Sequence, residues 1–324
     1  MNKRIKATLL MGCIIMAAGF MICIAGAIVS NVNGEQLFAD KMENGNGYVY
    51  SVAEDKLTGI DITVTDATVN IIGGSRESRI EVINFDENLY YVDNDAAKFT
   101  FRESSGYKQV LNFFESGFTF KGVRYIMRFS PPSGEKIINI YLTNKNILKN
   151  CYITAGTGKI SIEDIQSDAT YRFSVLDGSV TMNNVSTESD ISLSALESSD
   201  LNIVFNSVTA RDISVEAAYA TLKSQQLSFE SGKLNITHGS AQVDFIPLSQ
   251  YFKLNVNANG KLTVNDSPYT STYSIEKLPE AVEDPEETET TAVIPSVTIH
   301  GRELSVYLTG ECFGPSAGEE TTTE

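Results

Sequence analysis

Tryptophan is absent from this 324-residue sequence, histidine occurs twice, and proline is sparse until the C-terminal part. Basic residues are also few, because 25 Lys and Arg stand against 41 Asp and Glu, for a formal net charge of -16. Repulsion between like charges therefore disfavours a nucleic-acid partner, and so acidic a composition fits a solvated surface. The abundant Ser, Thr, Asn, Val and Ile suit β-structure with polar outward faces.

Cysteine is too rare to make a disulfide framework. Cys13 and Cys23 lie inside the apolar N-terminal segment, Cys151 begins the repetitive part of the sequence, and Cys312 lies near the C-terminus. We interpret Cys151 as a small buried apolar residue. A Cys151–Cys312 disulfide is conceivable in an exported chain, but nothing in the spacing argues for it.

Charge is missing from one long stretch, the 23 residues from Ala7 to Val29. A helix of this length would be about 35 Å long, enough to cross the hydrocarbon core of about 30 Å. Lys3, Arg4 and Lys6 precede the stretch, and such positive flanks stay in the cytoplasm. The sequence therefore predicts a cell-membrane protein that crosses the lipid bilayer once, through residues 7–29, with its C-terminal region extracytoplasmic.

A cleaved signal peptide is the alternative to this anchor. Ala25-Gly26-Ala27 satisfies the small-x-small rule for signal peptidase, and cleavage near Ala27 would yield a secreted protein. The apolar stretch exceeds the usual signal core of about 7–15 residues, which favours a retained anchor. Either route makes the folded part extracytoplasmic.

Short alternating apolar pairs recur about every twenty residues through the middle of the chain, a period typical of solenoids. The leading pairs begin at Ile153, Phe173, Ile191, Ile213, Leu234 and Leu254. A second pair follows each one after a break containing Gly or Ser, beginning at Ile160, Val180, Ile203, Ala220, Val243 and Leu262. Alternation at period two predicts half-buried strands, and Gly, Asn, Asp and Ser between them predict turns.

A unit this short cannot bury its own apolar face, so neighbouring units must stack. The pattern therefore predicts an all-β fold, a single-stranded β-solenoid with coils of about 20 residues, preceded by one transmembrane helix. Phe173, Ile191, Ile213 and Leu234 should then lie in one column. Ser174, Ser192 and Ser214 should form a polar ladder beside it.

The chain divides by composition into six parts. In order these are a cytoplasmic stub and membrane anchor (1–30), a linker (31–47), an N-terminal β-rich part (48–150), the regular repeats (151–275), an acidic linker or loop rich in Pro and Thr (276–295), and a closing β-hairpin with a flexible tail (296–324). Alternating runs in the N-terminal part predict strands at 48–50, 60–64, 68–72, 79–83, 90–92, 98–101, 110–114, 118–120, 125–129 and 137–142. Almost no helix is expected after the anchor.

The run Ile137-Ile-Asn-Ile-Tyr-Leu142, followed by Cys151-Tyr-Ile-Thr-Ala-Gly-Thr-Gly-Lys-Ile-Ser-Ile-Glu-Asp-Ile165, resembles the putative-adhesin family of bacterial envelope proteins. This is a domain of unknown function often carried behind a single membrane helix. The family has Pro where Thr143 stands here, and only the first coil keeps both glycines of its Thr-Gly pattern, Gly156 and Gly158. The resemblance covers about residues 48–310. It implies a right-handed β-solenoid at the cell surface and brings no catalytic residues.

Three short motifs could be interpreted as catalytic or ligand-binding sites. Gly156-Thr-Gly158-Lys159 lacks the spacing of a phosphate-binding loop and leads into a strand, so we interpret it as a turn. His238 with Ser240 suggests a base beside a nucleophile, but neighbouring residues at a strand corner face different ways. His238 and His300 are therefore expected as exposed turn residues, and two isolated histidines make no zinc site.

Acidic residues at the coil corners give two further alternatives. Asp168, Asp190 and Asp212 precede leading pairs, and a column of carboxylates would suit Ca²⁺, although Asp is also an ordinary turn residue. Asp164, Asp177, Asp190 and Asp212 are the loose candidates for a carbohydrate-active β-helix, a polysaccharide lyase or hydrolase. Such an enzyme needs two carboxylates within about 5–10 Å of each other in an open cleft.

Aromatic residues are concentrated in one short region, at Phe113, Phe114, Phe118, Phe120, Tyr125 and Phe129. We interpret them as core packing or end-capping residues rather than as a row that stacks on sugar rings. The sequence thus favours a membrane-anchored, non-catalytic adhesin or structural module without catalytic, metal-binding or cofactor-binding residues. Its expected partner is a cell-surface protein or glycan.

Overall fold

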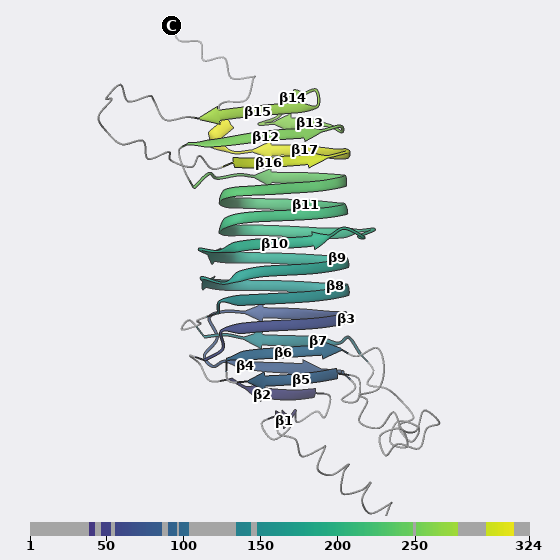
Figure 1. Ribbon diagram of the computed structural model, residues 1–324, viewed down its shortest axis with the longest axis vertical. Helices are drawn as coiled ribbons and strands as arrows, with labels where there is room; N and C mark the ends of the chain where they lie inside the picture. Colours follow the sequence, from purple (N-terminus) through teal and green to yellow (C-terminus); the bar gives the residue numbers. More distant parts are fainter. Residues whose placement is uncertain are drawn as a thin grey trace, which may run out of the picture.

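A computed structural model describes residues 39–42, 47–52, 56–85, 90–95, 97–103, 134–143, 148–248, 251–277 and 296–313 (Figure 1). Regular structure in these ranges is β-strand, apart from the 3-10 turn η2 (Glu311–Phe313), so the expected all-β class is confirmed. None of the helical structure in this part of the chain is long and apolar enough to cross a membrane. The expected span at 7–29 and the aromatic residues from Phe113 to Phe129 lie outside the described ranges.

The strands follow the alternating apolar residues closely. They are β1 (Ala39–Lys41), β2 (Gly47–Ser51), β3 (Gly59–Ile72), β4 (Arg79–Ile83), β5 (Tyr90–Asp95), β6 (Lys98–Glu103), β7 (Ile137–Tyr141), β8 (Asn150–Ser167), β9 (Thr170–Thr187), β10 (Asp190–Ala195), β11 (Leu201–Asp244), β12 (Phe252–Ala258), β13 (Leu262–Val264), β14 (Ser267–Tyr269), β15 (Thr272–Lys277), β16 (Ser296–Gly301) and β17 (Glu303–Thr309). The three expected strands between residues 110 and 129 lie outside the described ranges.

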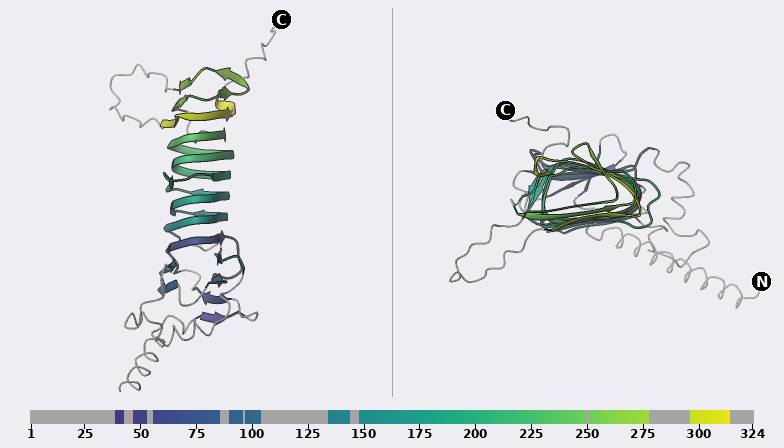
Figure 2. Two further views of the ribbon diagram at one scale, coloured as in Figure 1. Left: turned by 90° about the vertical axis from the view of Figure 1, so that its right-hand side faces the viewer. Right: turned by 90° about the horizontal axis from the view of Figure 1, so that it is seen from above.

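The long strands bend at corners and pair in parallel with the strand one turn further along the chain. Ile153 of β8 faces Phe173 of β9, Phe173 faces Leu193 of β10, and Ile191 of β10 faces Ile213 of β11. The turns stack along the long axis of the molecule and, seen along that axis, superpose on one flattened outline (Figures 1 and 2). Each turn therefore covers the backbone edge and the apolar residues of the next.

The expected single column of leading residues is wrong, because the register between β9 and β10 differs from the expected one by two residues. Phe173 lies opposite Leu193, whereas Ile191 lies opposite Tyr171. The first apolar residues of these two phrases are 18 residues apart, but the paired positions are 20 apart, because backbone pairing and the corners set the register. The serine ladder divides in the same way, since Ser174 faces Ser194 while Ser192 faces Ser214.

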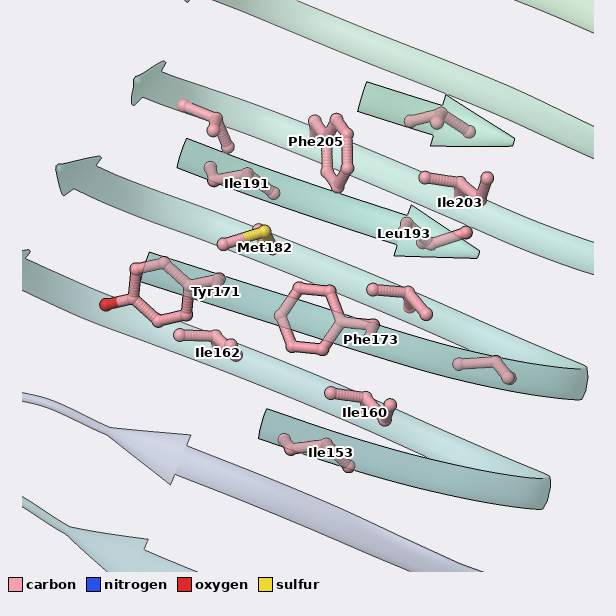
Figure 3. Packing of buried hydrophobic residues seen from close by; sticks show 14 of the residues in the cluster. Ile153, Ile160, Ile162, Tyr171, Phe173, Met182, Ile191, Leu193, Ile203 and Phe205 are labelled. Carbon is pink, nitrogen blue, oxygen red and sulfur yellow. The ribbon is translucent and has the colours of Figure 1, made fainter. Parts of the chain in front are cut away.

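The interior of the stack is apolar throughout the described turns. Side chains such as Ile153, Phe173 and Leu193 lie one above another between the strands (Figure 3). Phe205 and Met182 have no exposed surface, and Tyr171 keeps its buried hydroxyl in a hydrogen bond of 3.0 Å to Ser167 Oγ. A two-residue shift leaves every inward position apolar, which is why the misplaced column does not alter the core.

One corner of the turn requires glycine. Gly178 has a φ of 116°, and a Cβ atom built there would lie 1.9 Å from the carbonyl oxygen of Gly158 on the neighbouring turn. A side chain is therefore excluded both by the backbone conformation and by the stacking distance. Gly239 repeats the arrangement against the Ala220 carbonyl oxygen, also at 1.9 Å.

A second corner uses polar residues in the left-handed conformation. Asp164, Asn184, Ser207 and Gln226 have φ values of 55°, 53°, 52° and 55°. Their side chains bond along the stack, since Asn184 Nδ2 donates to Asp164 Oδ1 at 2.8 Å and Ser207 Oγ donates to Gln226 Oε1 at 2.8 Å. Asp and Asn tolerate this conformation, which explains why Asp164 and Asn184 occupy the corner in two successive turns.

Antiparallel strands cover both ends of the parallel stack. At the N-terminal end, β5 pairs with β6, while β4 pairs with both β7 and β2. At the other end, β15 pairs with β12 and β14 pairs with β13. Covered ends leave fewer unpaired backbone groups for contact with other chains.

The order of the turns departs from the order of the sequence at both ends. β3 pairs in parallel with β8 on one side and with β6 and β7 on the other. β16 and β17 lie between the last turn of β11 and the strands β12 and β13, in parallel with both. β16 and β17 pair with β11, β12 and β13 rather than with each other, so the expected hairpin between these two strands is corrected. The expected tail after residue 313 lies outside the described ranges.

Candidate functional site

A polar groove on the described surface is made of two adjoining depressions, with volumes of about 820 and 370 Å³. Both depressions include Gln166 and Ser186. The larger one also has Gly73, Gly74, Thr143, Asp164, Ile165 and Asn184 in its lining, and the smaller one has Leu148, Lys149, Ser167, Asp168 and Glu188. We call these two depressions together the polar groove.

The floor of the groove consists of the segments that close two successive turns, 164–168 and 184–188. Gln166 pairs with Ser186, and the residues before them, Ile165 and Val185, pair beneath and point into the core. Alternation at period two therefore places the carboxamide and the hydroxyl on the outer face. The floor is polar because the apolar residues of these two segments, Ile165 and Val185, point into the core.

The groove has a wall because β3 stops pairing with β8 before β8 itself ends. Its pairing with β8 ends at Ile72 and Glu163, and Gly73 N–H still donates to the Glu163 carbonyl at 2.8 Å. A Cβ atom on Gly73 would lie 1.9 Å from the Asp164 carbonyl oxygen, so only glycine fits this exit. The closing segment of β8 thus has no β3 residues beneath it, and the step forms the larger depression.

Hydrogen-bonding groups of every kind line the groove. The Asp164 carboxylate is held by the Asn184 amide, and both side chains are exposed. Thr143 is only 7% exposed, yet its Oγ1 has no hydrogen-bond partner. A buried hydroxyl without a partner is costly, and this one is covered by its neighbours, so it does not face a bound molecule. Lys149, exposed in the smaller depression, adds a positive charge beside Asp168.

The carboxylates considered as catalytic candidates occupy different parts of the turn. Asp164 lies in the groove at the left-handed corner. Asp177 lies at the glycine corner, where it accepts hydrogen bonds from the Ser199 and Asp200 amides at 2.7 and 3.0 Å. Asp190 and Asp212 face each other at the start of the leading strands. The structure brings together only this last pair.

The expected calcium column is not assembled as the spacing suggested. Asp168 lies in the groove rather than opposite Asp190. Asp190 Oδ1 is 2.8 Å from Arg211 Nη2, and Asp212 Oδ2 accepts a hydrogen bond of 2.7 Å from Ser231. Within the described ranges no three His, Cys, Asp or Glu side chains are grouped as metal ligands.

The two histidines lie apart. The ring of His238 stacks on Tyr219 with centroids 4.4 Å apart, and its Nε2 is 3.7 Å from Glu303 Oε2. Ser240 pairs along the backbone with Ser305, and His300 lies within β16 opposite Asn235 and Asn257. His300 is therefore a strand residue and not the hairpin corner expected from the sequence.

The remaining motifs agree with their plain interpretations. Gly158 forms a corner between two strand segments, and Lys159 leads into further strand, so no helix follows to form a phosphate loop. Cys151 is fully buried, and burial raises the pKa of its thiol. Cys151 and Cys312 are both free, so the conceivable disulfide between them is absent.

The groove itself was not found from the sequence. Thr143, Gly73 and Gln166 belong to three segments that lie far apart along the chain, and none of them marks a repeat. A signal was present in Thr143, which stands where the resembled family has proline. Its amide donates to Ser78 Oγ at 3.3 Å, a contact between segments far apart in the chain that no periodicity encodes.

No family model matches the chain, and no curated protein matches it. Among solved structures, a putative cell adhesion protein from Clostridium sporogenes is 10% identical with a TM-score of 0.31, covering 82% of this chain and 99% of that one. A putative adhesin from Parabacteroides merdae is 12% identical with a TM-score of 0.30, covering 83% of this chain and 95% of that one. Similarity at this level carries no argument about what this chain does.

Proposed function

We propose that the chain is a non-catalytic interaction module of a bacterial envelope, an adhesin-like right-handed β-solenoid that binds a hydroxyl-rich glycan in the polar groove. Parallel in-register pairing over successive turns supports the solenoid. Residues 7–29 hold the module at the outer face of the cytoplasmic membrane, as their apolar length and basic flank suggest. This assignment makes the groove the working surface of the protein.

The observation that carries the proposal is the chemistry of the groove. Asp164 supplies a carboxylate, and Asn184 and Gln166 supply carboxamides, all three exposed. Sugar hydroxyls both donate and accept, so they pair with each of these groups. The open, shallow shape also suits an extended polymer better than a small apolar ligand.

The catalytic alternative, a polysaccharide lyase or hydrolase, has one observation in its favour, the opposition of Asp190 and Asp212. Arg211 and Ser231 already engage these carboxylates, and the concave groove that we describe does not include them. We therefore assign the pair to stacking of neighbouring turns. Release of reducing sugar or unsaturated product by the purified chain, lost in Asp190→Asn, would instead establish the enzyme.

Binding to arrays of bacterial cell-wall fragments and surface glycans, with the full chain in detergent, tests the proposal. Gln166→Ala and Asp164→Asn should each weaken binding several-fold, because each removes a group that the groove offers. Asn202→Ala is the matched control, since Asn202 is an exposed carboxamide on a strand outside the groove. Absence of glycan binding, or equal binding by Gln166→Ala and the control, would contradict the assignment.

Thr143→Val separates a binding role from a structural one. Valine keeps the volume and removes the unpartnered hydroxyl, so the variant should be more stable to unfolding by about 1–2 kcal/mol. It should bind the glycan as the parent chain does, because the hydroxyl is covered by its neighbours. A variant that is destabilised, or that binds less tightly than the parent, would show that Thr143 Oγ1 has another role. Urea unfolding and the same arrays measure the two effects.

A further inference from the structure

The last turn of the sequence lies inside the stack rather than at its end. β16 pairs with β11 through Leu234 and Ile299, and with β12 through Ile299 and Val256. β17 continues this on the next side of the turn, with Val306 between Ala241 and Leu262. Residues 296–309, which we call the inserted turn, thus have a parallel neighbour on each side (Figure 1).

The two neighbours of the inserted turn match each other. Through Ile299, Leu234 is in register with Val256, and through Val306, Ala241 is in register with Leu262. Apolar residues face apolar residues at both positions. The alternating sequence itself passes from the phrase at Leu234 to the phrase at Leu254 with the period of the other turns. The chain therefore encodes a site in which a turn is inserted between two turns that would also stack directly.

The inserted turn fits this site closely. Val297, Ile299, Leu304, Val306 and Leu308 are all 2% exposed or less. The apolar void beside them, bounded also by Phe245 and Phe313, is about 10 Å³, no larger than one water. The site therefore selects a specific alternating sequence by shape, and not merely any extended strand.

The connection that precedes the inserted turn is long enough for this turn to come from either of two copies of the chain. Eighteen residues separate Lys277, the end of β15, from Ser296, the start of β16. Fully extended, that number of residues spans up to about 60 Å, whereas stacked turns are about 4.8 Å apart. The connection is thus far longer than the return to a nearby level of the same stack requires.

From these observations we infer that the inserted turn is exchanged between two copies of this chain, each copy placing its residues 296–309 between β11 and β12–β13 of the other. Every contact made within one chain is reproduced in the exchanged pair, so the added cost is mainly that of association. Repeat proteins are prone to such exchange because each unit contacts only its neighbours. The partner is a second copy because the site matches this sequence.

Gln242 and Tyr307 provide the test, because they are opposed and exposed in β11 and β17. Two differently tagged full-length chains are co-expressed, one with Gln242→Cys and the other with Tyr307→Cys, both with Cys13, Cys23 and Cys312 replaced by Ser. A short bifunctional thiol-reactive cross-linker should couple the two introduced cysteines and so join the two differently tagged chains. Lys223→Cys replaces Gln242→Cys in the control, because Lys223 is an exposed residue of β11 outside the pairing with β17.

The expected result is a cross-linked heterodimer several-fold more abundant with Gln242→Cys than with Lys223→Cys. A single chain carrying both Gln242→Cys and Tyr307→Cys shows whether the opposed positions react at all. If that chain links internally while the mixed chains do not link above the control, exchange is excluded. If the double variant does not link either, the insertion of β17 beside β11 is itself overturned.

Discussion

Gly178 shows how stacking restricts single residues. Its φ is 116° and its missing Cβ would fall 1.9 Å from the Gly158 carbonyl oxygen. Gly59, by contrast, has only the Lys98 side chain near its would-be Cβ, at 3.4 Å, and that side chain can move. Substituting each of these two glycines therefore distinguishes the clash caused by the neighbouring turn from the general cost of replacing a glycine.

Gly178→Ala should destabilise the protein by about 2–4 kcal/mol, because it combines a strained φ with a backbone clash. Gly59→Ala should change stability by less than about 1 kcal/mol. Equilibrium urea unfolding of the two variants measures the difference. Equal effects from both would mean that the neighbouring turn can move away from residue 178.

Residue types at corners were only partly predictable. The sequence marks Gly158 and Gly178 by their place between two apolar pairs. It did not predict that Asp164 and Asn184 adopt the left-handed conformation at one corner, although Asp and Asn recur there with the period of the turns. Their role becomes visible only when stacking brings Asn184 Nδ2 to Asp164 Oδ1, because hydrogen bonds between turns are not local in sequence.

The loop between β10 and β11 is the clearest irregular element of the stack. Six residues separate Ser194 from Leu201, where the paired residues Ser174 and Gly178 have three between them. The extra residues project outward, and Leu196 is 64% exposed. Asp177 of one neighbouring turn accepts the Ser199 and Asp200 amides, while Ser198 Oγ donates to the Tyr219 carbonyl of the other, so the Asp177 carboxylate holds the 199–200 part of the loop.

The anchoring is pH-dependent. Hydrogen bonds from the Asp200 and Ser199 amides lower the pKa of Asp177 below its ordinary value of 3.8. A depressed folded-state pKa contributes stability above the ordinary value, and that contribution is lost as the pH falls through the folded-state pKa. Protection of the two amides from hydrogen exchange should therefore be high at about pH 5 and should be lost on acidification, at a pH below the ordinary carboxyl pKa of 3.8.

Asp177→Ala supplies the comparison for this exchange experiment. In that variant the same amides should be weakly protected at every pH, after correction for intrinsic exchange rates. Protection that survives acid in the parent chain, or that remains in Asp177→Ala, would show that another group holds the loop.

Elements were predicted better than their connections. The strands beginning near Ile60, Arg79 and Ile137 follow directly from period-two alternation. The position of Ile299 between Leu234 and Val256 does not, because the phrase at Leu254 continues the period and conceals an inserted turn. The groove was missed for the same reason, since it depends on where β3 leaves the stack.

At the scale of the whole molecule, stability should come from contacts between neighbouring turns. Ile62, Ile153 and Phe173 occupy one column, as do Val69, Ile160 and Val180. Removing the intervening turn would therefore bring apolar residues into contact with apolar residues. The molecule should then be shorter by about 4.8 Å.

Deletion of residues 153–172 should leave a folded protein with cooperative thermal unfolding and a β-type circular dichroism spectrum. Deletion of 153–171 is the control, because it differs by one residue and turns Arg172 toward the interior, which reverses both faces of the strand. The control should fail to fold. Equal behaviour of the two deletions would contradict a stack in which each turn is specified by its neighbours.

The two departures from sequence order have a consequence for biosynthesis. β3 receives neighbours on both sides only from later residues, and the gap between β11 and β12 receives its occupant only from residues 296–309. A polypeptide that emerges N-terminus first cannot therefore complete either tip progressively. A chain truncated by a premature stop would lack the strands that complete one end of the stack. Cellular proteases should therefore degrade truncated chains faster than full-length ones.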